Sequence, residues 1–499
     1  MPQLPTTVVV PTIGRPSLAV MLRALADGTG PLPQAVVVVD DRPSGPPLAP
    51  TLDDIGLPNL SVVRSGGGGP ARARNLGWRL ARTPWVSFLD DDVVPDVDWR
   101  QRLAGDLDGL PGEVAGSQGR VRVPLPVHRR PTDWERGTAG LATARWITAD
   151  LTYRRSALST VGGFDERFPR AFREDSDLAL RVVATQGRLV TGDRWVSHPV
   201  RTAGFFASVR QQAGNSDDVL MRRLHGRSWR EACAAGPSRR RRHLATTACG
   251  LAAVGLVAAG RPRGAAVAAA LWGGGVAEFA AARILPGPCS PAEVGRMLLT
   301  SAVIPMAASW HTLRGLWRHR VARPWRGVPE LVLFDRDGTL VDDVAYNTDP
   351  TRVSPVPRAA EALTALRSAG VQLGVVTNQS GVASGLITPE QLDAVNARVD
   401  ELLGPFDVYE VCPHGRNDGC QCRKPAPGMV KRACHAVGVQ PSRCVVVGDI
   451  ASDVDAAESA GAVGILVPTP NTESGEVRAA LHVHTDLPTA VEAILCGHW

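Results

Sequence analysis

The sequence predicts two α/β domains joined by an α-helical segment. Short apolar runs typical of buried strands alternate with helical patterns in both end regions of the 499-residue chain. A chain of this length is expected to form two or three domains. Between the two regions the composition changes to long stretches rich in alanine, leucine and glycine. We therefore expect domains at 1–235 and 326–499, with a basic, alanine-rich helical linker at 236–325.

The N-terminal region shows the alternation of a layered α/β fold. Apolar runs at 8–10 and 36–39 have the character of buried strands, and a helical pattern at 18–26 lies between them. A further run at 86–89 leads directly into Asp90. Continuous runs of valine and leucine are typical of strands covered on both faces. These patterns predict an α/β sandwich with a mostly parallel sheet.

The middle segment begins with four arginines, Arg239–Arg242, and continues with apolar stretches at 244–260, 264–282 and 297–313. The first two approach the length of about 17–20 residues that a membrane span requires. One interpretation is a pair of helices packed within a soluble linker domain. The other is a re-entrant or interfacial hairpin held on the cytoplasmic face by the arginines. We expect membrane association.

Three strand patterns in the C-terminal region each end in a polar residue. They are 331–334 before Asp335, 371–376 before Thr377, and 444–447 before Asp449. Helical patterns occupy the intervals at 358–369, 389–403 and 427–437. Because open α/β sheets bind ligands at the carboxyl ends of their strands, we expect these polar residues to gather at one site.

The residues at this predicted site suit phosphoryl transfer. A carboxylate such as Asp335 can take a phosphoryl group as an aspartyl-phosphate. A second carboxylate, Asp337, can protonate the leaving oxygen and then activate water. The transferring group also needs cations and hydrogen-bond donors, which Lys424 and the motif from Asp449 to Asp453 would supply or hold. The alternative for Asp335-Arg-Asp-Gly-Thr is a turn in which aspartate caps a helix, but the order of all four motifs favours catalysis.

This set of motifs resembles the haloacid-dehalogenase superfamily of phosphatases. Within it, residues 328–499 are most similar to the D-glycero-D-manno-heptose 1,7-bisphosphate 7-phosphatases and their histidinol-phosphatase relatives. The resemblance implies Asp335 as nucleophile, Asp337 as general acid and base, and Mg²⁺ bound by Asp335, the Asp337 backbone carbonyl and Asp449. The implied substrate-binding residues are Asp343, Tyr346, Thr377, Asn378, Ser380, Arg423 and Lys424. Ile450 stands where the family commonly has a lysine, so one phosphate contact is expected to be missing.

A cysteine and histidine cluster precedes Arg423 and Lys424. Cys412, His414, Cys420 and Cys422 match the zinc loop of the heptose phosphatases, although this loop is short. Three thiolates and one imidazole form the composition of a closed, structural zinc site. The N-terminus lacks the pattern of a secretory signal, so we expect a reducing cytoplasm, where such a cluster favours metal over disulfides. The alternative is a cysteine-rich loop without metal.

In the N-terminal region, acidic residues follow predicted strands or begin a helix. Carboxylates after a strand, such as Asp90 and Asp92, can hold the cation that neutralises a diphosphate leaving group. Asp175, within an acidic cluster, suits a base that deprotonates an acceptor hydroxyl. Together with the early Val-Pro-Thr-Ile-Gly-Arg-Pro segment, this order resembles inverting family 2 glycosyltransferases of the GT-A fold. That resemblance implies nucleoside contacts from Asp40 and Asp41, and Mg²⁺ or Mn²⁺ at Asp90 and Asp92.

The sequence thus predicts a bifunctional carbohydrate enzyme acting on a sugar phosphate and a nucleotide sugar, with a glycan or lipid-linked acceptor. His198 is either a further diphosphate or metal contact or a structural residue. The alternatives are a phosphatase for histidinol phosphate or another sugar phosphate, and an N-terminal domain that is a nucleotidyltransferase or a non-catalytic sugar-binding module. The net charge of +6 is modest, and we expect no nucleic-acid partner.

Overall fold

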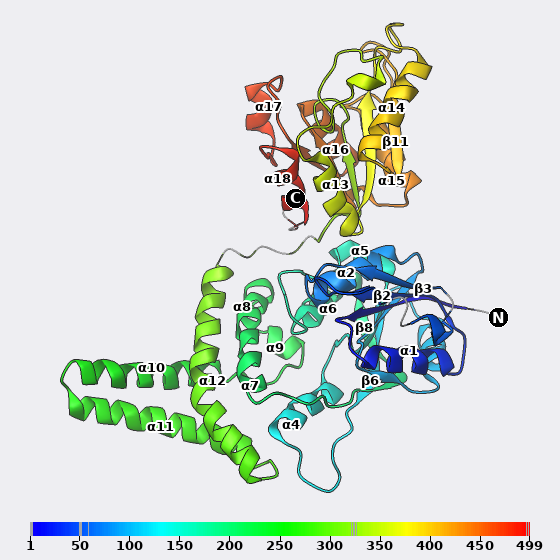
Figure 1. The fold of residues 1–499 in the computed structure, drawn as a ribbon. Helices are drawn as coiled ribbons and strands as arrows, with labels where there is room; N and C mark the ends of the chain where they lie inside the picture. The colour runs from blue at the N-terminus through cyan, green and yellow to red at the C-terminus, as the bar shows by residue number, and fades with distance from the viewer. Residues whose placement is uncertain are drawn as a thin grey trace. The chain divides into compact units, whose positions relative to one another are not determined.

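The computed structural model describes residues 3–48, 52–57, 59–320, 322, 325, 327–495, 497 and 499. The chain divides into two compact units, of which the first contains 1–157 and 164–324 and the second contains 158–163 and 325–499. The first unit includes both the predicted transferase region and the helices that follow it (Figure 1). Residue 326, the predicted start of the phosphatase domain, lies outside the described residues.

An eight-stranded sheet in the order β3-β2-β1-β4-β7-β6-β8-β5 forms the centre of the first unit. Its strands are β1 (Leu4–Thr12), β2 (Pro33–Asp40), β3 (Leu60–Arg64), β4 (Trp85–Leu89), β5 (Val94–Pro95), β6 (Val114–Arg122), β7 (Asp150–Arg154) and β8 (Arg188–Ser197). The predicted parallel arrangement holds from β3 to β4. In contrast, β7 runs antiparallel to both of its neighbours. The sheet as a whole is therefore mixed.

Four helices pack against this sheet, α1 (Ser17–Asp27), α2 (Pro70–Leu80), α3 (Trp99–Leu107) and α6 (Glu174–Gln186). The other helices of this part of the chain are α4 (Asp133–Ala139), α5 (Arg155–Val161), α7 (Ala207–Arg210), α8 (Gly214–His225) and α9 (Trp229–Ala232). Gly77 shows how closely α2 approaches the sheet, because an added Cβ there would lie 2.3 Å from Val9 Cγ1. Val8, Val10 and Leu22 are fully buried in the core between sheet and helix.

The predicted apolar segments form three long helices, α10 (Arg240–Ala258), α11 (Pro262–Ile284) and α12 (Pro291–Arg318). The three helices contact one another, and α12 also packs against α8. In Figure 1, α10 and α11 form a hairpin that projects from α12. Within the described residues, α11 is the single helix whose length and composition would allow it to cross a membrane.

The second unit contains a five-stranded parallel sheet in the order β11-β10-β9-β12-β13. Its strands are β9 (Leu331–Phe334), β10 (Gln372–Asn378), β11 (Val408–Cys412), β12 (Cys444–Gly448) and β13 (Val463–Leu466). Its helices are α13 (Ala359–Ser368), α14 (Pro389–Leu403), α15 (Gly428–Ala436), α16 (Ala451–Ala460), α17 (Ser474–Ala479) and α18 (Leu487–Leu495). The central strands β9 and β12 are completely buried, so the residues that follow them are held by a rigid support.

Candidate active sites

Asp335 and Lys424 form the centre of the second unit's site. Asp335 directly follows β9, and Lys424 comes from the loop before α15. Lys424 Nζ lies 2.6 Å from Asp335 Oδ1 and also donates to the Val376 carbonyl, at 2.9 Å. The Lys424 backbone N–H donates to Asn378 Oδ1 at the end of β10. The end of β10 therefore positions the lysine against the carboxylate.

Three carboxylates lie within 4.8 Å of one another at this edge, from Asp335, Asp449 and Asp453. Burial raises the pKa of Asp335 to about 8, even though Lys424 opposes the rise. Burial and the charge of Asp453 raise the pKa of Asp449 to about 6. An added Cβ on Gly338, whose φ is +79°, would lie 2.5 Å from Asp449 Oδ2. The cluster therefore carries negative charge that one lysine leaves only partly compensated.

The side chain of Asp337 is held outside this carboxylate cluster. Arg336 donates to both of its oxygens, at 3.0 and 2.9 Å. Gln379 Nε2 donates to Asp337 Oδ2 at 2.8 Å and to Thr377 Oγ1 at 3.0 Å. Arg336 and Gln379 are functional candidates that the sequence analysis missed. Gln379 lies between the predicted substrate-binding residues Asn378 and Ser380, but no spacing signal indicates its contact with Asp337.

A pocket of about 770 Å³ contains most of the predicted phosphatase residues. Those that line it are Asp335, Asp337, Asp343, Thr377, Asn378, Arg423, Lys424 and Asp449. Ile450 also lines it, at the position where the sequence analysis expected a missing phosphate contact. Tyr346 and Ser380 do not line the pocket. Tyr346 is more than half exposed and packs near Gly381, and Ser380 is bonded through its backbone carbonyl to Ser384.

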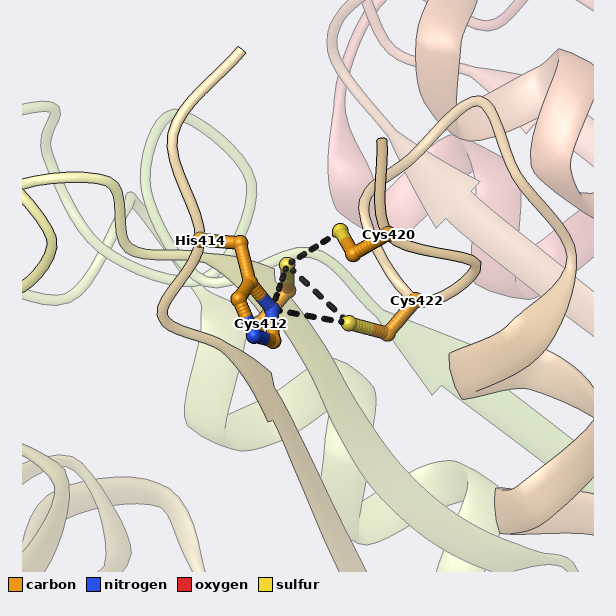
Figure 2. Close-up of side chains that lie close together, drawn as sticks. All are labelled: Cys412, His414, Cys420 and Cys422. Atoms are coloured by element: carbon orange, nitrogen blue, oxygen red, sulfur yellow. Dashed lines mark hydrogen bonds between the residues drawn. The ribbon is translucent and has the colours of Figure 1, made fainter. Parts of the chain in front are cut away.

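The four predicted zinc ligands converge at the end of β11 (Figure 2). Cys412 Sγ lies 3.8 Å from Cys420 Sγ, 3.4 Å from Cys422 Sγ and 3.6 Å from His414 Nδ1. His414 Nδ1 lies 3.2 Å from Cys422 Sγ. A regular tetrahedron with Zn–S bonds of about 2.3 Å has edges of about 3.8 Å, so these separations suit a tetrahedral ion. Arg423 donates to the His414 carbonyl, which connects the cluster to the phosphatase pocket.

In the first unit, a buried arginine connects the acidic turn after β4 to the start of α6. Arg74 donates to Asp90 Oδ1 and to Glu174 Oε1, each at 2.8 Å. Burial, reinforced by the charge of Asp175, raises the pKa of Glu174 to about 8. Arg74 and Glu174 are functional candidates that the sequence patterns did not indicate. The structure makes Arg74 the link between the predicted cation site and the predicted base.

Asp92, Asp175 and His198 face the same pocket. His198 Nε2 lies 3.6 Å from Asp92 Oδ1, and Arg201 Nε lies 2.9 Å from Asp92 Oδ2. Burial raises the pKa of Asp92, and the neighbouring Asp90 adds to the rise. Burial also raises the pKa of Asp175. The pocket thus brings together carboxylates from the turn after β4 and from the start of α6.

The two adjacent aspartates after β2 differ in their surroundings. Asp40 is buried and bonded to Arg42 and Arg64, and the bond from Arg42 lowers its pKa. Asp41 lines the transferase pocket, where Ser65 and the Gly69 backbone N–H donate to it. Asp41 therefore reaches the pocket directly, whereas Asp40 positions the two arginines.

The transferase pocket has a volume of about 1080 Å³ and contains both acidic and basic groups. Its acidic lining comprises Asp41, Asp90, Asp91, Asp92, Asp133, Glu174, Asp175 and Glu293. Its arginines are Arg15, Arg74, Arg136, Arg170, Arg201 and Arg296. Carboxylates can hold a cation and arginines can pair with phosphate, so a pocket that contains both is of a kind suited to a diphosphate.

Comparison with known proteins defines the class of each unit. Residues 7–169 match the model of glycosyl transferase family 2, and residues 343–461 match that of the haloacid dehalogenase-like hydrolases. The D-glycero-β-D-manno-heptose-1,7-bisphosphate 7-phosphatase of Pseudomonas aeruginosa is 38% identical over 144 residues, which are 28% of this chain and 81% of the relative. The corresponding enzyme of Bordetella bronchiseptica is 33% identical over 175 residues, covering 33% and 98%.

Two solved structures show partial likeness. The B. bronchiseptica heptose bisphosphate phosphatase, complexed with magnesium and phosphate, is 31% identical, covers 33% of this chain and 98% of its own, and has a TM-score of 0.31. A mannosyltransferase from Pyrobaculum calidifontis, in complex with GDP-Man and Mn²⁺, is 19% identical, covers 63% and 88%, and has a TM-score of 0.38.

The protein is therefore a two-enzyme chain, a glycosyltransferase followed by a phosphatase. Through its C-terminal domain it belongs to the family of D-glycero-β-D-manno-heptose-1,7-bisphosphate 7-phosphatases, within the haloacid dehalogenase-like hydrolases.

Proposed function

We propose that the C-terminal domain removes the 7-phosphate of a D-glycero-D-manno-heptose 1,7-bisphosphate through an aspartyl-phosphate on Asp335. The supporting observation is the placement of Asp335, which is buried at the base of a pocket and paired with Lys424 at 2.6 Å. The similarity to heptose bisphosphate phosphatases over 81–98% of their length supports the choice of substrate.

In the proposed reaction, an Asp335 carboxylate oxygen attacks the phosphorus and the bond to the sugar oxygen breaks. Asp337 gives its proton to that leaving oxygen. Arg336 and Gln379 hold the Asp337 side chain in place by donating hydrogen bonds to it. In the second step Asp337 takes a proton from water, whose oxygen attacks the phosphorus and releases inorganic phosphate and Asp335. Lys424 offsets charge on the phosphoryl oxygens.

The carboxylate cluster fits a divalent cation. Asp335, Asp449 and Asp453 each place a carboxylate oxygen within 4.8 Å of the other two, and carboxylate oxygens are ligands that Mg²⁺ prefers. Asp335, the Asp337 backbone carbonyl and Asp449 would hold Mg²⁺, which supplies further charge neutralisation when bound. Asp453, which lies 2.6 Å from Lys424 Nζ, fixes the position of the lysine in this scheme.

The choice of sugar phosphate is tested by phosphate release from purified protein. The panel would contain heptose 1,7-bisphosphate, histidinol phosphate and simple hexose phosphates. We expect the highest kcat/KM for the heptose. A preference for histidinol phosphate would replace the proposed substrate while leaving the aspartyl-phosphate chemistry in place.

We also propose that Cys412, His414, Cys420 and Cys422 bind one structural zinc ion. All four ligand atoms lie within 4.8 Å of one another, and four of their six separations are 3.2–3.8 Å, which supports this assignment together with their ligand composition. The ion would hold the loop that carries Arg423 and Lys424 rigid over the phosphate. Metal analysis of protein purified without added zinc tests this, with one zinc per chain expected.

For the N-terminal domain we propose inverting transfer from a nucleotide sugar. Asp175 takes the proton of an acceptor hydroxyl, the acceptor oxygen attacks the anomeric carbon, and the bond to the diphosphate breaks. Asp90 and Asp92 both line the pocket after β4, and their carboxylates are of the ligand type that Mg²⁺ or Mn²⁺ takes. Asp41 is the better placed of the two predicted nucleoside contacts. Arg201 and His198 lie beside Asp92, where a diphosphate would bind.

The proposed acceptor is a glycan or a lipid-linked sugar at the cytoplasmic face of a membrane. In support, Arg296 and Met297 of the apolar helix α12 line the transferase pocket. Loss of donor hydrolysis and transfer in Asp92→Ala would support catalysis by this domain. Retention of both activities would leave the N-terminal domain as a sugar-binding module.

A further inference from the structure

The hairpin of α10 and α11 exposes apolar side chains to an extent unusual for helices of a water-soluble unit. Leu251, Val254 and Val257 of α10 are each at least 64% exposed, and Val267 and Leu271 of α11 at least 61%. Only 17% of the most apolar 18-residue window of α11 is buried. Isolated exposed apolar residues are ordinary, but a contiguous surface of this kind marks an interaction site.

The apolar residues of α11 are distributed around the whole helix instead of forming one stripe. From Gly264 to Gly275 the helix carries no charged side chain, and the same holds for α10 from Leu244 to Ala258. A helix that is apolar all round requires an apolar environment on all sides. A second copy or a protein partner would cover one face, whereas the interior of a lipid bilayer surrounds the hairpin.

The packing of α10 on α11 is close and uses glycine. An added Cβ on Gly275 would lie 2.5 Å from Thr246 Oγ1, and one on Gly250 would lie 2.9 Å from the Trp272 ring. Such close approach of helices through small residues is typical of packing within membranes, where apolar burial between helices contributes little. The pairing therefore remains favourable when lipid replaces water.

The dimensions and charges of the hairpin also match a bilayer. At 1.5 Å per residue, the charge-free stretches 244–258 of α10 and 264–277 of α11 are about 22 and about 21 Å long, so the hairpin can enter a hydrocarbon core of about 30 Å and return without crossing it. Arg261 and Arg263 lie at the tip. At the other end, Arg239 and Arg242 each lie 2.9 Å from Glu278 and neutralise the one acidic residue of α11. Charges are thus confined to the two ends, where headgroups lie.

Helix α12 exposes more large apolar side chains than it buries. On its buried face, Thr300 and Ser301 are hydrogen-bonded to Arg283 and Ser309 to Thr247, beside the apolar Met297, Ile304 and Ala308. Its exposed face carries a helical stripe of large apolar residues, namely Leu299, Val303, Met306, Trp310, Leu313 and Trp317. Tryptophan side chains are favoured at the boundary between lipid and water. The stripe is suited to lie along a bilayer surface.

The hairpin is fixed to the transferase pocket. Arg283 of α11 pairs with Asp133 of α4 at 2.9 Å, and Arg136 of α4 donates to the Arg283 carbonyl. Glu293 of α12 accepts from the Asp133 backbone N–H. Asp133, Arg136 and Glu293 all line that pocket. The position of the apolar helices therefore determines where the pocket wall lies.

From these observations we propose that α10 and α11 insert as a hairpin into a bilayer containing anionic lipids, while α12 lies along its surface. The hairpin enters and returns, so the chain before α10 and the chain after α11 lie on the same side of the bilayer. This inference concerns attachment and is independent of both proposed substrates.

The test is flotation of the full chain with phosphatidylcholine vesicles that contain 30% phosphatidylglycerol, followed by a wash in 1 M salt. The wild-type chain should float and should remain bound after the wash, because an inserted hairpin does not depend on screened charges. Val254→Asp, in the middle of α10, should lower the ratio of bound to free protein at least ten-fold. The matched control is Val20→Asp on the exposed face of α1, which should float like the wild type.

Three outcomes would overturn the inference. They are a chain that stays unbound with these vesicles, binding that the salt wash abolishes, and flotation of Val254→Asp equal to that of the wild type. Sedimentation without lipid completes the experiment. If the wild-type chain forms a stable dimer that does not bind vesicles, and if Val254→Asp dissociates that dimer, the apolar surface is an interface between two copies of the chain. Phosphate release and donor hydrolysis, measured on the same samples, report separately on the proposed functions.

Discussion

Lys424 shows how one buried cation organises the phosphatase site. Burial disfavours its charged form, but the two carboxylates of Asp335 and Asp453 outweigh burial and raise its pKa. The lysine therefore stays charged throughout the physiological range. Its fixed position depends on Asn378 and the Val376 carbonyl, which leaves Nζ directed at the nucleophile.

Replacing this lysine should damage both catalysis and stability. In Lys424→Met we expect phosphate release to fall by about 10²–10³-fold, the usual effect of removing a group that stabilises transition-state charge. We also expect the free energy of unfolding of the second unit to fall by about 3 kcal/mol, because Asp335 and Asp453 lose their buried partner. Steady-state kinetics and urea denaturation measure the two effects. The exposed Lys431→Met is the control, and equal behaviour of the two variants would contradict the assignment.

Arg74 has the equivalent position in the transferase unit. Arg74→Met would leave Glu174 buried without its cation, so we expect a loss of about 3 kcal/mol in the free energy of unfolding of that unit. Donor hydrolysis should fall as well, because Asp90 loses its partner. Phosphate release should be unchanged. Arg23→Met on the exposed face of α1 serves as the comparison, and a stable Arg74→Met variant would refute the linking role.

At the scale of elements, we expect that opening the cysteine loop after β11 weakens substrate binding more than it slows the attack by Asp335. Chelation, or Cys422→Ser, should raise KM several-fold and lower the melting temperature, while kcat changes less. The reason is that Arg423 is bonded to the His414 carbonyl and loses its support when the loop opens. Cys289→Ser, at an exposed cysteine of the other unit, is the matched control. Full affinity and stability in chelated protein would contradict a zinc role.

The end of α12 carries a residue that makes stability depend on pH. Burial lowers the pKa of His319 to about 4, with help from the nearby Arg318. An unfolded histidine titrates near 6.5. Between these two values the unfolded state binds the proton and the folded state does not, so stability falls as the pH is lowered from about 6.5 to about 4. Above pH 6.5 the effect is absent.

His319→Gln should remove this dependence. We expect the free energy of unfolding of the first unit to decline less steeply with acid in the variant, by about 1 kcal/mol per pH unit within that window. Urea denaturation at a series of pH values measures the two slopes. Identical slopes for the variant and the wild type would show that His319 titrates normally.

Local patterns predicted many elements closely. The helical pattern at 389–403 coincides with α14, because Thr388 and Gln391 form a capping box that fixes its start. The strand runs at 331–334 and 86–89 also match β9 and β4 closely. Strand direction could not be predicted from the sequence in the same way. β7 lies antiparallel between β4 and β6, and nothing in its own residues specifies those partners.

The site was predictable where chemistry is concentrated in motifs. Asp335, Lys424 and the four metal-ligand candidates were identified because their residue types and order are distinctive. Gln379, Arg74 and Glu174 were missed because their roles arise from contacts between distant positions, such as the 100 residues that separate Arg74 from Glu174. Asp40 and Asp41 looked equivalent in the sequence. Only the fold shows that Asp40 is hydrogen-bonded to two arginines, whereas Asp41 lines the pocket.

On the scale of the whole molecule, the two pockets are built from separate sets of residues. The transferase pocket is lined by residues up to Met297, and the phosphatase pocket by residues from Asp335 onward. We therefore expect the activities to be separable. Asp92→Ala should abolish sugar transfer and leave phosphate release within two-fold of the wild type, measured on the same preparation. A parallel loss of both would show that the units depend on each other.

The converse substitution, Asp335→Asn, tests the phosphorylated-carboxylate mechanism most directly. The measurement is phosphate release from heptose 1,7-bisphosphate by the full chain, with sugar transfer monitored in parallel. An amide in place of the attacking oxygen should reduce phosphate release at least about 10³-fold while transfer continues. Hydrolysis at the wild-type rate by Asp335→Asn would contradict the account.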